Sequence, residues 1–191
     1  MKVHLKDVRV SFAQGLFTPA QVQGQGDPKY SASFIFPRDH AAVAALTEAV
    51  IEAAKEKWGE KHMEVLKTLK AADRLPVHDG DAKGETPGYA GNLFVNASNK
   101  VRPLVIDGQR APLTASDGKP YSGAYVNAVV DVWAMDNQFG KRVNASLLGV
   151  QFVRDGDRLS GGSVASADDF EAIPQKDAAA AKAGGGAASL F

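Results

Sequence analysis

The most constraining feature of this sequence is the alternation of side-chain types between Tyr121 and Met135. Successive side chains of a β-strand point to opposite faces, so the alternation predicts a long strand with one small, apolar face and one mixed face. Turn-forming residues at 136–140 separate it from a second β-patterned segment at 141–153, which predicts a long hairpin. The apolar set, suited to a barrel interior, is Ser122, Ala124, Val126, Ala128, Val130, Val132 and Ala134. The opposite set, a candidate binding surface, is Tyr121, Gly123, Tyr125, Asn127, Val129, Asp131, Trp133 and Met135.

Shorter β-patterned segments precede this hairpin. Residues 3–12 alternate with an irregularity near Asp7, which indicates a strand with a bulge. Segments rich in Gly, Pro, Gln or charge predict loops. The other expected strands are 30–36, ended by Pro37, 92–101 and 102–106, and the expected loops are 15–28 and 73–88.

Between 39 and 72 the apolar spacing becomes helical. Asp39 is a suitable N-cap, Gly59 is a suitable stop, and 60–72 predicts a shorter second helix. Strands and helices do not alternate later in the chain, which argues against a doubly wound sheet. The predicted fold class is α+β and mainly β, a small barrel or sandwich with a helical insert at 39–72.

The distribution of charge narrows the choice of partner. The chain has 22 Lys and Arg and 22 Asp and Glu. Two of the basic and four of the acidic residues fall in 163–191, so residues 1–162 hold 20 basic and 18 acidic residues, a net +2. Binding of a polyanion would therefore depend on a local positive groove rather than on a strongly basic surface.

Other features of the composition argue against disulfide-bonded, zinc-thiolate, secreted and membrane-spanning proteins. Cysteine is absent, which excludes disulfides and thiolate zinc sites and agrees with a reducing compartment. The amino terminus lacks the apolar run of a signal peptide, and no segment approaches the roughly 20 apolar residues of a membrane span. We expect a cytoplasmic protein with no membrane partner and no cofactor.

After residue 162 the composition changes to Ala, Gly, Ser and Asp without periodic apolar residues. This predicts one domain at 1–162 followed by a flexible, Ala- and Gly-rich tail at 163–191. The tail ends in Leu190 and Phe191, which form a weak candidate site for replication proteins. A passive linker is the alternative.

Aromatic and basic residues are interleaved between 88 and 162. Cations that contact phosphates and flat side chains that stack on bases are what a protein needs to hold a single strand without reading its sequence. If about four cations contact phosphates, log K falls with log salt with a slope near −3, from about −0.7 per phosphate. The candidate binding residues are Tyr89, Phe94, Lys100, Arg102, Tyr121, Tyr125, Trp133, Phe139, Lys141 and Arg142, with Arg110 and Lys119 as further cations.

Three segments carry a resemblance to a known family: GNLFVNASNKVRPLVID at 91–107, DGKPYSGAYVNA at 117–128, and DNQFGKRVNASLLGVQF within 130–162. In these segments the chain resembles bacteriophage single-stranded DNA-binding proteins with an OB fold. The resemblance implies a five-stranded antiparallel OB barrel, no enzymatic activity, and the coating of single-stranded DNA during replication or recombination. It also implies the host cytoplasm as location and a preference for DNA, with RNA and duplex DNA as weaker ligands. Stacking and phosphate contacts alone do not sense the 2′-hydroxyl, so on local chemistry RNA stays open as a competing ligand.

Three alternatives stay open at this point. The Val-Asn-Ala triplets at 95–97, 126–128 and 143–145 favour structural hydrogen bonds across the sheet over base contacts. The loop residues His78, Asp79 and Asp81 could hold a divalent ion in a metal-dependent hydrolase. A phage structural or assembly protein is also compatible with a β-rich core, because a fold alone does not define a ligand.

Overall fold

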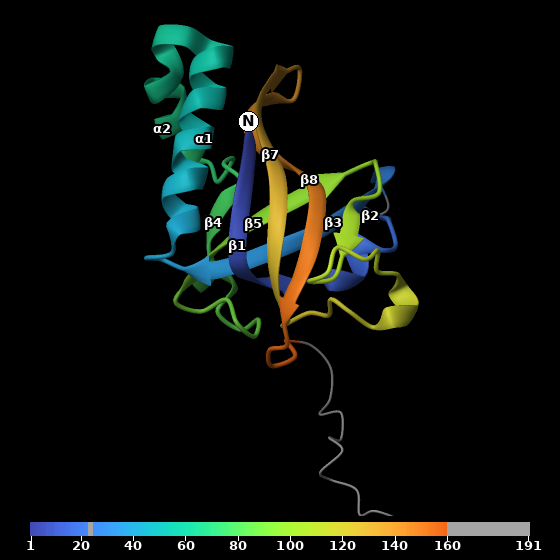
Figure 1. The fold of residues 1–191 in the computed structure, drawn as a ribbon. Coiled ribbons are helices and arrows are strands. Elements are labelled where there is room, and N and C mark those ends of the chain that lie inside the picture. The colour runs from blue at the N-terminus through green and yellow to red at the C-terminus, as the bar shows by residue number, and fades with distance from the viewer. Residues whose placement is uncertain (23–24, 160–191) are drawn as a thin grey trace, which may run out of the picture. The chain divides into compact units, whose positions relative to one another are not determined.

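A computed structural model describes residues 1–22 and 25–159 (Figure 1). The expected division at residue 162 and the Leu190–Phe191 site fall beyond these residues, so both stay predictions. No helix in the described ranges is long and apolar enough to cross a membrane. The strands are β1 Lys2–Ser11, β2 Ala20–Val22, β3 Gln25–Pro37, β4 Val77–Asp79, β5 Asn92–Asn99, β6 Leu104–Ile106, β7 Tyr125–Asn137 and β8 Gly140–Arg154. The helices are α1 Ala41–Trp58 and α2 His62–Ala71, with short 3-10 turns at Ala13–Leu16, Gly59–Lys61, Gly80–Lys83 and Ala115–Asp117.

The strands form one strongly curved sheet in the order β4-β5-β3-β1-β7-β8-β6, with β2 paired to β3. The expected mainly-β fold with a helical insert is confirmed. Two details differ from a five-stranded antiparallel barrel. β6 runs parallel to β8, and the sheet is not closed. β5 does approach β8, where the side-chain amide of Asn99 donates to the Leu147 carbonyl at 3.1 Å.

The core lies inside this curved sheet and under α1, which packs against β1 and β7. The alternation predicted for β7 is confirmed, since Val126, Ala128, Val130 and Val132 are buried while their neighbours in the strand are more exposed. Burial of one apolar face fixes the register of the strand, because a slip of one residue would reverse both faces.

The bulge expected near Asp7 is present. The β1–β7 register shifts between Leu5 and Val8, and Asp7 has a positive φ of 50°. Asp is among the residues that tolerate this region. The Asp7 carboxylate accepts two hydrogen bonds of 3.1 Å from the Arg154 guanidinium, which ties the bulge to the end of β8.

Three local predictions are wrong. The N-cap of α1 is His40, whose Nδ1 accepts from the Ala42 amide at 3.1 Å, because the turn at 38–40 moves Asp39 outside the helix. The segment 15–28 is not all loop, since β2 and the first residues of β3 pair there. The segment 73–88 contains β4, which adds an edge strand to β5.

Candidate nucleic-acid interface

The β7–β8 hairpin presents an aromatic and basic arm at its tip. Trp133 pairs across the hairpin with Asn144, and Met135 pairs with Arg142. The Trp133 side chain is exposed, and its indole N–H donates to the Ser146 hydroxyl at 2.9 Å, which fixes the ring. Phe139, in the two-residue turn, is 78% exposed. The arm therefore offers two aromatic side chains that are not part of the core.

The outer face of β3 and β5 forms a polar, uncharged floor beside this arm. Ser31 pairs with Ser98, and Ser33 pairs with Asn96. The Ser33 hydroxyl donates to the Asn96 side-chain oxygen at 2.6 Å. Small hydroxyl and amide side chains leave room above the strands, and they carry no fixed charge that would repel a phosphate.

The segment between α2 and β4 lies beside the arm and the floor and forms the third side of a groove. The Arg74 carbonyl accepts from the Val143 amide at 3.2 Å, which holds the base of the arm. His78 Nδ1 lies 2.7 Å from the Asp73 carboxylate, and its ring stacks on Phe94. The arm, the floor and this segment line an open groove of about 870 Å³, which we call the hairpin groove.

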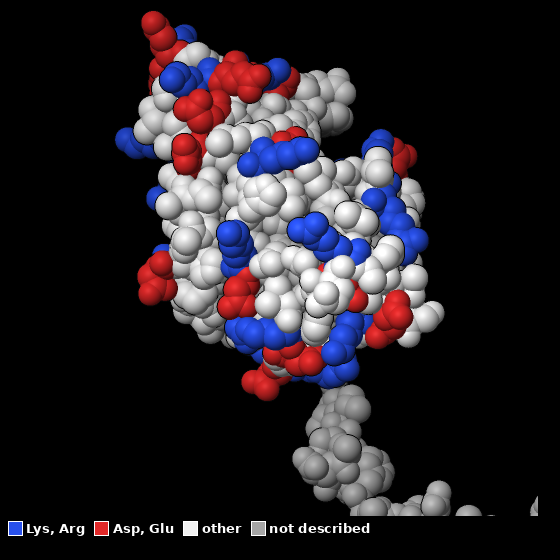
Figure 2. Space-filling model, in the orientation of Figure 1, with Lys and Arg blue, Asp and Glu red and all other residues white. Residues whose placement is uncertain are grey.

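The hairpin groove is locally basic although the chain has no net charge. Five cations and one carboxylate, Asp73, line it. Figure 2 shows that basic and acidic side chains are intermixed on the visible face of the molecule, so the surface as a whole is not basic. The local positive groove required by the charge argument is therefore present. Its cations are Lys29, Arg74, Lys100, Lys141 and Arg142.

Two of these cations already bind carboxylates. Lys100 pairs with Asp27, and Lys141 pairs with Asp136, which also accepts from the Trp58 indole N–H at 3.1 Å. The hydrogen bond from Lys141, followed by that from Trp58, lowers the pKa of Asp136 below its usual value. Within residues 1–22 and 25–159, Lys29, Arg74 and Arg142 form no ion pair.

The position of this groove fits the OB architecture. With β1, β3, β5, β7 and β8 taken as the barrel strands, the groove lies on the second and third strands beside the loop between the fourth and fifth. That face and that loop are where OB folds bind oligonucleotides. Five of the ten predicted binding residues line it: Lys100, Trp133, Phe139, Lys141 and Arg142.

Two predicted stacking residues are buried instead. Tyr89 is 0% and Phe94 is 3% exposed, and they form a small second core with Ile35 and Leu159. The residues that follow β4 fold back over the outer face of β5, so the two rings meet edge to face at 4.9 Å. Buried rings cannot stack on a base, so we exclude both from the interface.

Replacement of Tyr89 by Phe tests this assignment. The Tyr89 hydroxyl is buried without a hydrogen-bond partner among the described residues. An unsatisfied buried hydroxyl costs about 1–3 kcal/mol, so Tyr89→Phe is expected to leave the free energy of unfolding equal or higher. Urea denaturation measures the free energy of unfolding. Tyr89→Ala removes the whole ring and serves as the contrast, because by analogy with a buried Phe it should lower the free energy of unfolding by about 3–5 kcal/mol. A Tyr89→Ala variant as stable as the wild type would contradict the assignment.

The other predicted residues lie apart from the hairpin groove. Tyr125 is half-buried under the Arg154 guanidinium, which lies 3.5 Å from the ring centroid. Tyr121 donates its hydroxyl to Asp155 at 2.9 Å and lines a different groove. Arg102, Arg110 and Lys119 are exposed but line neither groove.

The sequence reasoning missed Lys29, Arg74 and Met135 as lining residues. The first two lie outside the 88–162 segment, and only the strand order brings them in. Met135 lies on the predicted binding face but is not among the ten predicted binding residues. The Val-Asn-Ala triplets did contain a signal, because two of their amides, Asn96 and Asn144, line the groove.

The structural reading of the triplets is confirmed for two of their three Asn side chains. Asn96 bonds to Ser33, and Asn127 donates to the Gln151 side-chain oxygen at 3.1 Å. Asn127 also accepts from the Asp7 amide at 3.0 Å, at the bulge. These amides therefore hold neighbouring strands together.

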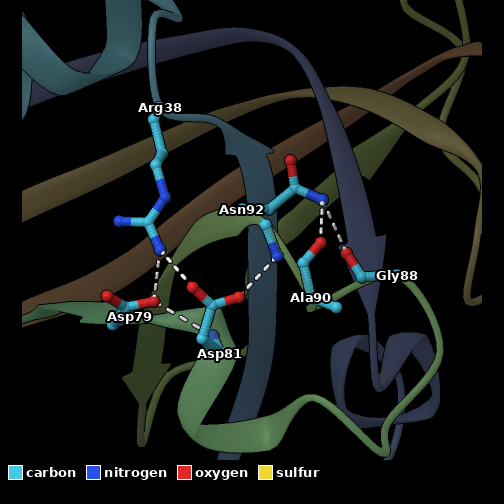
Figure 3. A network of polar contacts seen from close by, with 7 residues as sticks. Arg38, Asp79, Asp81, Gly88, Ala90 and Asn92 are labelled. Carbon is cyan, nitrogen blue, oxygen red and sulfur yellow. Dashed lines mark hydrogen bonds and ion pairs between the residues drawn. The ribbon is translucent and has the colours of Figure 1, made fainter.

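The proposed metal loop is an ion-pair network. Arg38 binds the Asp79 carboxylate at 2.6 Å and the Asp81 carboxylate at 2.8 Å, as Figure 3 shows. Asp81 also accepts from the Gly91 amide at 2.6 Å, which anchors the segment over the second core. His78 is directed to Asp73 instead. In the described residues no three His, Asp or Glu side chains gather as metal ligands.

A curved, OB-type sheet with a basic, aromatic groove on this face is typical of single-strand nucleic-acid-binding proteins. Residues 1–180 match the family described as Enterobacter phage Enc34, ssDNA-binding protein, and the chain belongs to that family.

The chain is also similar to individual phage proteins. Protein p50 of Acyrthosiphon pisum secondary endosymbiont phage 1 is 49% identical over 174 residues, which cover 90% of this chain and 93% of the relative. The Enc34 single-stranded DNA-binding protein in complex with ssDNA is 25% identical with a TM-score of 0.71, covering 83% and 89% of the two chains. The single-stranded DNA-binding protein gp2.5 of bacteriophage T7, at 13% identity and a TM-score of 0.51 over 99% and 100%, shares the fold.

Proposed function

We propose that this protein binds single-stranded DNA in the hairpin groove and coats it during phage DNA replication or recombination. The observation that carries the proposal is the meeting of Trp133 and Phe139 with Lys141 and Arg142 at one open groove. Bases stack on the two rings, and the cations contact phosphates, which gives weak sequence preference. The protein acts without catalysis, in the host cytoplasm.

Fluorescence anisotropy of labelled oligo(dT), titrated with the protein at several salt concentrations, tests this proposal. Unlabelled duplex DNA and poly-U serve as competitors. Salt-sensitive binding that both competitors displace poorly supports a DNA-coating role. Equal displacement by poly-U would make RNA an equal ligand, and the absence of binding at low salt would refute the proposal.

Arg142→Ala tests the electrostatic part. Arg142 is exposed at the groove and forms no ion pair within the described ranges, so it is available to a phosphate. Loss of one phosphate contact is expected to reduce the magnitude of the salt slope by about 0.7. Lys67→Ala, at an exposed position of α2 outside the groove, removes the same charge and is the control. The same change of salt slope in both variants would show that the salt dependence reflects only the net charge of the protein and not a phosphate contact at Arg142.

Asp136→Asn is expected to strengthen binding. The change releases Lys141 for a phosphate, while the amide oxygen can still accept from Trp58. An exposed ion pair is weak, so the gain in affinity at low salt is up to about 5-fold. Asp39→Asn removes the same charge away from the groove and serves as control in the anisotropy titration. Weaker binding by Asp136→Asn would contradict the role of Lys141.

A further inference from the structure

A second groove lies on the helical insert, next to the hairpin groove. It has a volume of about 620 Å³ and is lined by the end of α1, one face of α2 and the hairpin arm. We call it the insert groove. Trp58, Lys61, Val65, Leu69, Arg74 and Lys141 are among its lining residues. Arg74 and Lys141 also line the hairpin groove, so the two grooves are neighbours.

One wall of the insert groove is apolar. Trp58 and Val65 are half-buried, and Leu69 is buried beneath them. The Trp58 indole N–H donates to the Asp136 carboxylate at 3.1 Å, which fixes the orientation of the ring. A partly exposed indole beside an aliphatic side chain is a suitable contact for another protein, because Trp is enriched at protein interfaces.

The charge of the insert groove restricts what can dock there. Three cations, Lys61, Arg74 and Lys141, and one carboxylate, Glu64, line it. Lys141 is paired with Asp136, whereas Lys61 and Arg74 form no ion pair within the described part of the chain. Complementary charges favour the correct partner and like charges repel others. The occupant should therefore bring carboxylates together with an apolar contact.

α1 carries a surface of this kind. Glu48, Glu52 and Glu56 are spaced by four residues, which places them on one face of the helix. All three are exposed, and none forms an ion pair among the residues that the structure describes. Met1, 52% exposed, lines the same shallow hollow, as does one cation, Lys55. We call this surface the acidic face of α1.

The insert groove and the acidic face of α1 point in different directions. An α-helix turns by about 100° per residue, so Glu56 and Trp58, two residues apart, point about 200° apart. One copy can therefore contact a neighbour on each side. Contact between two different surfaces is heterologous and can repeat from copy to copy. The chain has no net charge, so copies do not repel each other strongly.

We propose that the acidic face of α1 of one copy docks in the insert groove of the next copy along the same single strand. This contact rests on the function proposed above and extends it, because it makes strand binding cooperative. Exposed ion pairs are weak, so the contact alone does not hold free copies together. Neighbours on one strand have a local concentration in the millimolar range, at which a weak contact is populated.

Anisotropy titrations compare labelled oligo(dT) strands that accommodate one copy and four copies, after a stoichiometric titration of poly-dT has given the number of nucleotides per copy. One or two exposed ion pairs contribute up to about 5-fold each, so the wild type is expected to bind the longer strand about 5- to 25-fold more tightly per site. Lys61→Glu and Glu52→Lys should each abolish this ratio. Lys67→Glu, on α2 outside the insert groove, is the control for net charge and should keep it.

The double variant Lys61→Glu/Glu52→Lys has the net charge of the wild type and should regain the ratio, because the two reversed charges again attract each other between copies. Loss in both single variants with recovery in the double variant supports the contact. Loss without recovery, or an equal loss in Lys67→Glu, refutes it.

The same titrations separate this contact from the parent proposal. If the wild type binds neither strand at low salt, single-strand binding itself fails. If the wild type binds both strands equally tightly per site, or if Lys61→Glu and Glu52→Lys keep the wild-type ratio, docking between copies is refuted while strand binding stands.

Discussion

Trp133→Ala is expected to weaken the binding of labelled oligo(dT) by about 5- to 150-fold, the loss of one base stack of about 1–3 kcal/mol. Trp133 lies on the outer face of the hairpin arm, and the ring is oriented by the hydrogen bond from its indole N–H to Ser146. The ring is exposed and contributes little to the core, so the thermal midpoint should change little. Anisotropy titration and thermal unfolding measure the two effects.

Two further variants make this result specific. Trp133→Phe keeps a flat ring but loses the bond to Ser146, and it should retain much of the affinity. Met63→Ala removes another exposed apolar side chain, on α2 and outside the groove, and should leave the affinity unchanged. Normal binding by Trp133→Ala would refute the proposed stacking role of this residue.

Gly123→Ala is expected to destabilise the fold by several kcal/mol, in the upper range of single substitutions. A Cβ at Gly123 would lie 2.0 Å from the Asp157 carbonyl oxygen and 2.9 Å from the Arg158 Cα, and its φ is +113°. The backbone cannot easily move away, because the Gly123 amide donates to the Val10 carbonyl at 2.8 Å. Urea denaturation of wild type and variant gives the loss.

Gly118→Ala separates the cost of a side chain at positive φ from the cost of a steric clash at the Cβ. Gly118 also has a positive φ, of +65°, but a Cβ there meets nothing within 4 Å. It should cost only about 1 kcal/mol, the ordinary penalty for a side chain in this region. Similar losses in the two variants would mean that the close approach of Gly123 to Asp157 is unimportant.

The sequence predicted those features that depend on neighbours along the chain. The two faces of β7 follow from a period of two residues, and the end of α1 follows from Gly59, which has a positive φ of 57°. The exposure of Phe139 follows from its position in a turn. Each of these needs only local geometry.

The remainder depends on contacts between distant segments. Tyr89 and Phe94 are buried because the segment held by Arg38, more than 40 residues earlier in the chain, covers β5. Lys29 and Arg74 reach the hairpin groove only through the strand order and the bond between Arg74 and Val143. Neither the packing of this segment over β5 nor the strand order produces a local pattern in the sequence.

The carboxylates beside the groove cations have a consequence for selectivity. Lys100 and Lys141 are already neutralised by Asp27 and Asp136, so an arriving phosphate replaces an anion rather than filling an empty positive field. Such an exchange yields little net attraction toward a polyanion at a distance. A duplex, whose bases are stacked on each other, gains this exchange and contacts with Lys29, Arg74 and Arg142, the cations that are unpaired among the described residues. In the proposed binding mode an unpaired strand also gains contact with Trp133 and Phe139, so we expect discrimination between duplex and single strand to come from the rings and not from the charge.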